Sequence, residues 1–311
     1  MPSEQARDCG EFGRPGCRRP STRSFRQWSI GDRLTLDDAT EDTQNPNVLA
    51  AASSVADRIS LAEDALAEAG AELIPTRFGR VIRQAAFPHV YDANLVRRAR
   101  LREDTLDEAL ELFAQPLRAV GARHLQLTLD GADVPDGLAP LLRRRGFVRD
   151  RLIAMTLDGP LLKPRAPGVT LKRVPDEAPW DSFSFAMDRM NREEAWYAPS
   201  VSMEIVGSMR AKSERGALDV FVAERDRRVV GTVGLAIHRG VASIFSVGTL
   251  PDARRRGVGR TLVIDTVERA QQAGADLVYL IARAEDSPKD MYRKLGFHAE
   301  LGFDVWLRLP R

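Results

Sequence analysis

The sequence is poor in cysteine, and its two cysteines cannot form a disulfide framework. Cys9 and Cys17 both lie near the start of the chain, in a polar stretch, and no others follow. The four histidines are scattered, without the spacing of metal ligands on one element. We therefore expect no metal site and no disulfides, which is typical of a protein in a reducing cytoplasm.

Long apolar runs and a strong net charge are also absent. No apolar segment approaches the length that spans a membrane, and residues 1–30 lack the apolar core of a secretory signal. The net charge is +2, so composition gives no argument for a membrane surface as partner. The arginine-rich runs at 97–102, 143–145 and 254–256 lack interleaved aromatic residues, so we expect no nucleic-acid partner either.

Composition divides the chain into a tail, two folded parts and a linker. Residues 1–46 are rich in Arg, Ser, Gly, Asp and Pro and poor in aliphatic residues, which predicts a disordered tail. Three prolines and a closing glycine at 160–168 predict the linker. The chain is long enough for two domains, 47–159 and 169–311, and for at least one sizeable core. We expect the first part to have too few strands to cover its own core and therefore to dock against the second.

Hydrophobic periodicity gives the elements of the first part. It predicts a helix from a cap at Asn47 to about residue 69, stopped by Gly70. A second helix opens with Thr105-x-x-Glu108, a capping-box pattern. Strands are predicted at 71–75, 80–86, 124–130 and 151–157, with a short strand and turn at 88–94 and a short helix that ends at residue 146. We expect the strand at 151–157 to close this part.

The second part alternates strands and helices. A strand at 169–174 precedes helices over 180–215, broken near residue 199, and a strand hairpin over 218–237. A strand at 241–249, a helix from about 258, a strand at 276–283, a short helix and strands over 297–309 complete it. This order predicts a mixed α/β sheet flanked by helices.

A loop rich in arginine and glycine joins the strand at 241–249 to the following helix. Gly257 and Gly259 allow the backbone to close on a ligand, and the helix start offers unpaired N–H groups and a positive dipole end. Arginines on both sides add positive charge. The loop therefore suits a pyrophosphate, although a simple helix cap with solvated arginines would show the same pattern.

A second motif, Met291-Tyr292-Arg293-Lys294-Leu295-Gly296-Phe297, follows one strand later. Together with Arg254-x-x-Gly257-x-Gly259, it resembles the two signatures of the GNAT family of N-acetyltransferases over about residues 168–310. The resemblance implies a GNAT-like mixed, mostly antiparallel sheet flanked by helices. It also implies acetyl-CoA as cosubstrate and transfer of its acetyl group to a primary amine by direct attack.

The resemblance also implies roles for particular residues. Tyr292 corresponds to the general acid that protonates the leaving thiolate, although it could instead be a tyrosine packed by its ring. The backbone of Val247, Gly248 and Thr249 corresponds to the strand beside which the pantetheine arm lies, and Gly248 indicates either a bulge or a close backbone approach. Thr249 departs from the family's usual aliphatic residue. The cofactor-binding loop corresponds to Arg254, Arg255, Arg256, Gly257, Val258, Gly259 and Arg260.

Candidates for accepting the amine proton are weaker. Glu193, with Glu194 beside it, lies in the helical segment that forms the acceptor site in the family. Glu285 stands where family members often carry an asparagine, with Asp286 next to it. Both could be ordinary solvated carboxylates, and a chain of water molecules could take the proton instead. The acceptor is left open between a small-molecule amine and a protein amine, and the oligomeric state is open as well.

The two halves contain an internal repeat. Leu141-Leu142-Arg143-Arg144-Arg145-Gly146-Phe147 aligns with the second signature, and each segment lies between two predicted strands. In the first copy Leu142 replaces the tyrosine, and the run 97–102 contains no glycine. We interpret 47–159 as a truncated, degenerate GNAT-like domain and 169–311 as the catalytic domain. A non-catalytic acyl-CoA-binding or assembly module is the alternative, and such a module would not need Tyr292.

Overall fold

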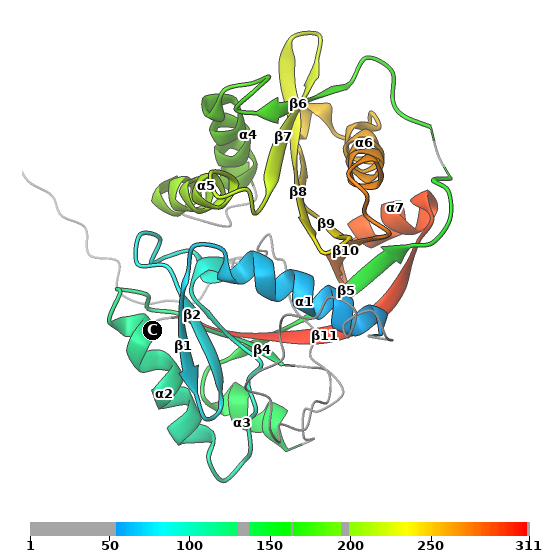
Figure 1. Cartoon of the computed structure of the whole chain (residues 1–311). Helices are drawn as coiled ribbons and strands as arrows, with labels where there is room; N and C mark the ends of the chain where they lie inside the picture. The colour runs from blue at the N-terminus through cyan, green and yellow to red at the C-terminus, as the bar shows by residue number, and fades with distance from the viewer. Residues whose placement is uncertain (1–53, 130–136, 163, 194–198, 310–311) are drawn as a thin grey trace, which may run out of the picture.

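The computed structural model describes residues 54–129, 137–162, 164–193 and 199–309 (Figure 1). The tail predicted for 1–46 lies outside these ranges. In the described part of the chain, no helix combines the length and the apolar character needed to cross a membrane.

The first half of the chain contributes three helices and five strands. These are α1 (Val55–Glu68), β1 (Glu72–Thr76), β2 (Gly79–Arg83), β3 (Leu95–Arg97), α2 (Leu106–Arg118), β4 (Leu125–Leu129), α3 (Leu138–Arg144) and β5 (Val148–Leu157). The predicted strands at 71–75, 80–86, 124–130 and 151–157 are thus confirmed to within a few residues.

The second half begins after the linker. Its elements are β6 (Thr170–Val174), α4 (Trp180–Glu193), α5 (Pro199–Ser213), β7 (Asp219–Arg225), β8 (Arg228–His238), β9 (Val241–Thr249), α6 (Val258–Gln272), β10 (Leu277–Arg283), α7 (Pro288–Leu295) and β11 (Phe297–Arg308). The order agrees with the sequence pattern, except that 297–309 forms a single long strand.

The structure corrects two capping predictions. α1 begins after Ser54, whose hydroxyl accepts a hydrogen bond from the Asp57 N–H at 3.2 Å while the Asp57 carboxylate accepts one from the Ser54 N–H at 3.0 Å. This reciprocal capping box fixes the helix start, so Asn47, which lies outside the described residues, is not the cap. α2 begins after Thr105 as predicted, but the Thr105 side chain makes no capping hydrogen bond.

The segment 88–94 is a turn and a short 3-10 helix (Tyr91–Ala93), so the strand predicted there is wrong. Its hydrogen bonds are local: the Ala93 N–H donates to the Val90 carbonyl at 3.1 Å, and the Asn94 side-chain amide donates to the Phe87 carbonyl at 2.7 Å. Asn94 is fully buried, and its side chain gives this backbone an alternative to strand pairing.

All the strands described join one sheet, in which each half of the chain contributes one parallel pair of strands. The order is β1-β2-β3-β4-β11-β5-β10-β9-β8-β7-β6, eleven strands in all. β3 and β4 are parallel, connected through α2, and β9 and β10 are parallel, connected through α6. The neighbouring pairs are otherwise antiparallel, so the sheet is mixed and mostly antiparallel, as the sequence predicts.

The two halves exchange their last strands. β5, from the first half, pairs with β10 from Leu152–Arg283 to Thr156–Tyr279. β11, from the second half, pairs with β5 on one side and with β4 on the other. The expectation that 151–157 closes the first half is therefore wrong, because this strand lies between two strands of the second half. The linker divides the chain but does not divide the sheet.

The hydrophobic cores follow the exchange. Trp306 of β11 is fully buried in the cluster formed by α2, α3 and the first-half strands. Met155 of β5 is buried in the cluster formed by α4, α6 and the second-half strands. Each core thus contains a large side chain supplied by the other half, and neither is complete without it.

Helix α1 adds a polar link between the halves, and in Figure 1 it lies between them. Asp64 receives hydrogen bonds from Arg97 Nε at 2.6 Å and Arg98 Nε at 2.8 Å. Burial alone would raise the pKa of Asp64, but the two guanidinium groups hold it below its ordinary value. Its neighbour Glu63 faces the second half, where its carboxyl accepts a hydrogen bond from the Tyr279 hydroxyl at 2.5 Å.

Burial raises the pKa of Glu63 to about 8, because the hydrogen bond from Tyr279 and the more distant Arg97 only partly offset the loss of water. Between pH 4.5 and 8 the folded chain therefore keeps a proton that the unfolded chain has released. The Glu63 contribution to the free energy of unfolding is present below pH 4.5 and falls as the pH rises, by up to about 1.4 kcal/mol per pH unit.

We predict that Glu63→Gln removes this contribution, because glutamine keeps the acceptor for Tyr279 and does not titrate. Chemical denaturation between pH 5 and 7.5 measures the free energy of unfolding, which should fall more steeply with rising pH in wild type than in the variant. Glu111→Gln, which changes an exposed carboxylate on α2, serves as the control and should track wild type. Parallel pH profiles for wild type and Glu63→Gln would show that Glu63 ionises normally in the folded chain.

Candidate active site

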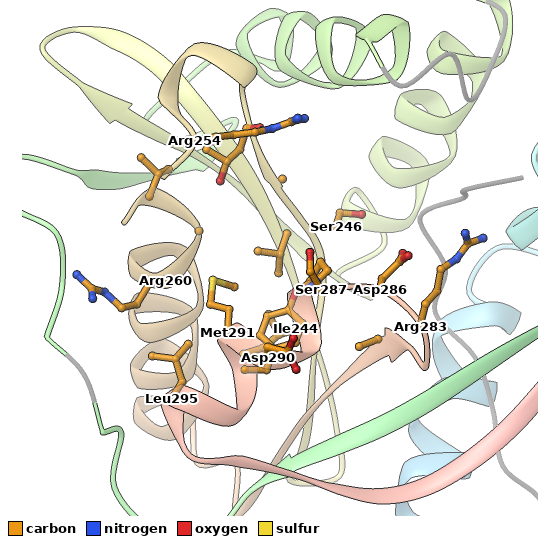
Figure 2. Close-up of a pocket in the computed structure, with 18 of the residues that line it drawn as sticks. Ile244, Ser246, Arg254, Arg260, Arg283, Asp286, Ser287, Asp290, Met291 and Leu295 are labelled. Atoms are coloured by element: carbon orange, nitrogen blue, oxygen red, sulfur yellow. The ribbon is translucent and has the colours of Figure 1, made fainter. Parts of the chain in front are cut away.

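The site lies where the parallel strands β9 and β10 separate. The two strands pair from Val241–Leu277 to Ile244–Leu280. Beyond that point, no pairing between them is found in the described residues. Ligand sites in α/β sheets form where the carboxyl ends of neighbouring strands diverge. A cavity of about 1260 Å³ occupies this split, bordered by α6 and α7 (Figure 2).

A β-bulge helps β9 to turn away from β10. The register with β8 shifts between the pairs Gly234–Phe245 and Thr232–Gly248, and Ser246 between them has a φ of 48°. The extra residues increase the local bend. The bulge is therefore at Ser246 and Val247, and Gly248 itself is paired.

Gly248 instead satisfies the other interpretation of the sequence, a close approach. A Cβ atom at this position would lie 2.5 Å from the Met190 sulfur, so the glycine lets the Met190 side chain of α4 lie directly on β9. The backbone of Val247, Gly248 and Thr249 lines the cavity. The β10-facing edge of β9 thus offers backbone groups along the split, as the pairing of an extended arm requires.

At one end of the cavity the start of α6 is arranged for an anion. Gly257 precedes the helix with a φ of 78°, and the first intrahelical hydrogen bond runs from the Thr261 N–H to the Gly257 carbonyl at 3.1 Å. The N–H groups of the first helical turn are therefore not used within the helix. A Cβ at Gly257 would lie 2.9 Å from the Ala166 Cβ, so the turn is also packed tightly from outside.

Arginines surround this helix start in different ways. Arg254 donates through Nε to the Thr249 carbonyl at 3.2 Å, which ties the loop to the end of β9. Arg260 Nε is buried, and no described residue accepts a hydrogen bond from it. A buried guanidinium donor beside free helix N–H groups fits a pyrophosphate. Arg255 also lines the cavity, whereas Arg256 is exposed and does not.

Tyr292 lines the same cavity from α7. Its side chain is 7% exposed, and its ring packs edge-on against Phe297 with the ring centres 6.3 Å apart. Burial raises the pKa of Tyr292 to about 12, so the hydroxyl keeps its proton at neutral pH. No group in the described ranges hydrogen-bonds to that hydroxyl. Tyr292 is thus both a packed ring and a protonated donor at the cavity wall.

The predicted base candidates are placed unequally. Glu285 is an exposed residue of the turn after β10 and lines the cavity. Glu193 is the last residue of α4, and its side chain, like the whole of Glu194, lies outside what the structure describes. Over the described ranges, no group of three His, Cys, Asp or Glu side chains is arranged to hold a metal ion.

Sequence reasoning missed several residues that line the cavity. Arg283 ends β10, and its position at the carboxyl end of a parallel strand could have indicated it. Ser246 differs from its neighbours in its positive φ, and no sequence pattern predicts that backbone conformation. Leu152 of β5 comes from the first half, and no local pattern could have placed it here because it arrives by strand exchange.

Comparisons with known proteins agree with this geometry. Residues 178–297 match the family described as "Acetyltransferase (GNAT) family". Mycothiol acetyltransferase of Cellulomonas flavigena is 27% identical over 231 residues, which is 67% of this chain and 64% of the relative's own length. The chain thus matches slightly less than two thirds of that relative.

Two solved structures share the fold over most of their length. One is a GCN5-related N-acetyltransferase from Kribbella flavida, with a TM-score of 0.58 and 21% identity over 84% of this chain and 97% of that one. The other is a functionally unknown conserved protein from Staphylococcus epidermidis, with a TM-score of 0.62 and 17% identity over 78% and 96%. The fold is the mixed α/β fold of these structures. Residues 178–297 form an acetyltransferase domain of the GNAT family, whose cosubstrate is acetyl-CoA.

We predict that Gly257→Asp weakens acetyl-CoA binding by about 2 to 4 kcal/mol, because it sets a carboxylate where the phosphates should lie. Gly274→Asp is the matched control: this glycine has a φ of 87°, stands at the other end of α6 and has open space around it. It should impose similar backbone strain and leave binding unchanged. Calorimetric titration measures both, and equal affinity of the folded Gly257→Asp protein and wild type would move the phosphate site elsewhere.

Proposed function

We propose that this chain transfers the acetyl group of acetyl-CoA to a primary amine by direct attack of the amine nitrogen. The observation that carries the proposal is one cavity that joins the glycine-capped start of α6, with the buried Arg260 donor, to the protonated hydroxyl of Tyr292. The first feature suits phosphates, and the second suits a leaving sulfur. A module that only binds acyl-CoA would need the first and not the second.

The residues that would hold acetyl-CoA follow from the geometry. We assign the anionic end to the N–H groups at the start of α6 and to Arg260, and the extended arm to the free edge of β9 at Val247–Thr249. Acetyl-CoA supplies the activated acyl group, a thioester. The separation of β9 and β10 leaves the path to that group open from the side opposite α6.

Tyr292 would supply the proton that the sulfur needs on leaving. The hydroxyl is protonated across the neutral range because burial raises its pKa to about 12. The same desolvation disfavours a thiolate at this place, since burial opposes every anion. Donation from the Tyr292 oxygen neutralises the sulfur as the C–S bond breaks, and the phenolate left on Tyr292 takes its proton back from solvent through the cavity.

The acceptor we propose is a small-molecule amine. The Cellulomonas relative is named a mycothiol acetyltransferase, and by analogy the present chain would act on a compound of that size rather than on a protein. The amine must lose a proton to become nucleophilic. Glu285 at the exposed mouth is one candidate acceptor for that proton, Glu193 is another, and water is the third.

We propose that the first half does not bind a second acetyl-CoA. Its parallel pair β3–β4 is joined through α2, as β9–β10 is through α6, but no glycine precedes α2. At the position of Tyr292 it has Leu142, which is fully buried in the first-half core. Its role would be to complete the sheet and one wall of the second-half site through β5.

We predict that Tyr292→Phe lowers turnover by about 10²–10⁴, the usual cost of losing a general acid, with little change in acetyl-CoA affinity. Free thiol released from acetyl-CoA measures turnover on an amine found by screening. Tyr91→Phe, which removes a hydroxyl from the first half far along the chain, is the control. If Tyr292→Phe turns over at the wild-type rate, Tyr292 is a packing residue and the proton comes from elsewhere.

A further inference from the structure

The cavity has two ends with opposite charge. The lining side chains just before and at the start of α6 are cationic: Arg254, Arg255 and Arg260. Helix α7 adds one lining charge of each sign, Lys294 and Asp290. Figure 2 shows Arg283 and Asp286 on the other side of the split from Arg260 and Leu295. There the lining side chains are Arg283, Glu285 and Asp286, at the end of β10 and in the turn after it.

The single cation of this second end is neutralised from the first half of the chain. Arg283 lies 2.7 Å from Asp150 of the exchanged strand β5, nitrogen to carboxylate oxygen, with exposed side-chain fractions of only 16% and 21%. The strands stay together here, because the Ala284 N–H donates to the Arg151 carbonyl at 2.9 Å. Such a shielded pair is held more firmly than an exposed one.

Asp286 has one cation beside its backbone, because Lys289 Nζ donates to its main-chain carbonyl at 3.1 Å, but Lys289 does not line the cavity. The Asp286 carboxylate is half-buried and lines the cavity, and among the described residues no ion pair to it is formed. With Arg283 paired to Asp150 and Lys289 outside the cavity lining, the carboxylates of Asp286 and, further out, Glu285 make this end of the cavity negative. A site with this balance attracts cations and repels anions.

We infer that Asp286 binds the ammonium group of the acceptor, and that Asp150 is a positioning residue that keeps Arg283 from neutralising Asp286. The acceptor class is then a primary amine with a cationic or neutral body, and amines that carry a carboxylate are disfavoured. The inference rests on the proposed function, because it takes this end of the cavity as the acceptor side. It also makes the acceptor preference depend on the first half.

Three four-carbon probes isolate charge from size: 1-butylamine, 1,4-diaminobutane and 4-aminobutanoate. Each is titrated by calorimetry into the full chain saturated with CoA, so that no turnover occurs. We expect the diamine to bind about three- to tenfold more tightly than butylamine, the range for a partly exposed charge pair, and the amino acid to bind most weakly. Asp286→Asn should abolish the order. Asp158→Asn, which changes an exposed carboxylate just after β5 and outside the cavity lining, should preserve it.

Asp150→Asn tests the contribution of the first half. Because Arg283 loses its partner in this variant, it is expected to pair with Asp286. The affinity for 4-aminobutanoate should then rise relative to the affinity for the diamine. Asp150→Glu keeps the charge and should keep the wild-type order. Asp304→Asn is the matched control, because Asp304 lies 2.5 Å from Arg149 and forms a comparable pair between β5 and β11 outside the cavity lining.

The outcomes separate the two levels of the proposal. Failure of wild type to bind CoA at all would count against the proposed function. CoA binding without any charge preference among the probes, or without detectable probe binding, would overturn only the inference. If Asp286→Asn keeps the wild-type order of probe affinities, the role of Asp286 is overturned. If Asp150→Asn still binds CoA and also keeps that order, the role of Asp150 is overturned.

Discussion

The exchange of β5 and β11 between the two halves is the constraint on which the rest of the structure depends. Each closing strand pairs with the parallel strand of the other half, so removing either half would uncover a long row of unpaired backbone groups on β4 or β10. The exchange extends to the cores, because Trp306 of β11 is buried in the first-half core and Met155 of β5 in the second-half core. Because strand pairing and burial are shared in both directions, the halves are expected to unfold together.

The site is a consequence of the same arrangement. β10 is pinned on one side by β5, while on the other side β9 leaves it at the bulge around Ser246. The cavity therefore opens between β10, which pairs with β5 of the first half, and β9, which pairs with β8. The end of the cavity at the start of α6 is lined by residues of the second half, and its other end includes Leu152, with Asp150 behind Arg283. The first half thus helps to shape the cavity through β5.

The features that sequence could predict are local. The turn at Gly257–Gly259 and the turn after Tyr292 are read from neighbouring residues, and most strands follow from alternation over a few positions. Ser54 replaced Asn47 as a cap because a reciprocal hydrogen bond with Asp57 decided the helix start. The strand exchange and the pairs Glu63–Tyr279 and Asp150–Arg283 join residues more than a hundred positions apart, and no local pattern encodes such pairings.

The central claim, that both halves form one unit around a single acetyl-CoA site, is tested most directly by cutting the linker. A protease site inserted between Gly159 and Pro160 lies where a glycine with open space around it precedes the linker. After cleavage, size-exclusion chromatography in native buffer should show the two pieces eluting together, and calorimetry should give one acetyl-CoA per pair with affinity close to that of the uncut chain. Separation into two folded pieces, with full acetyl-CoA affinity in the second alone, would contradict the account.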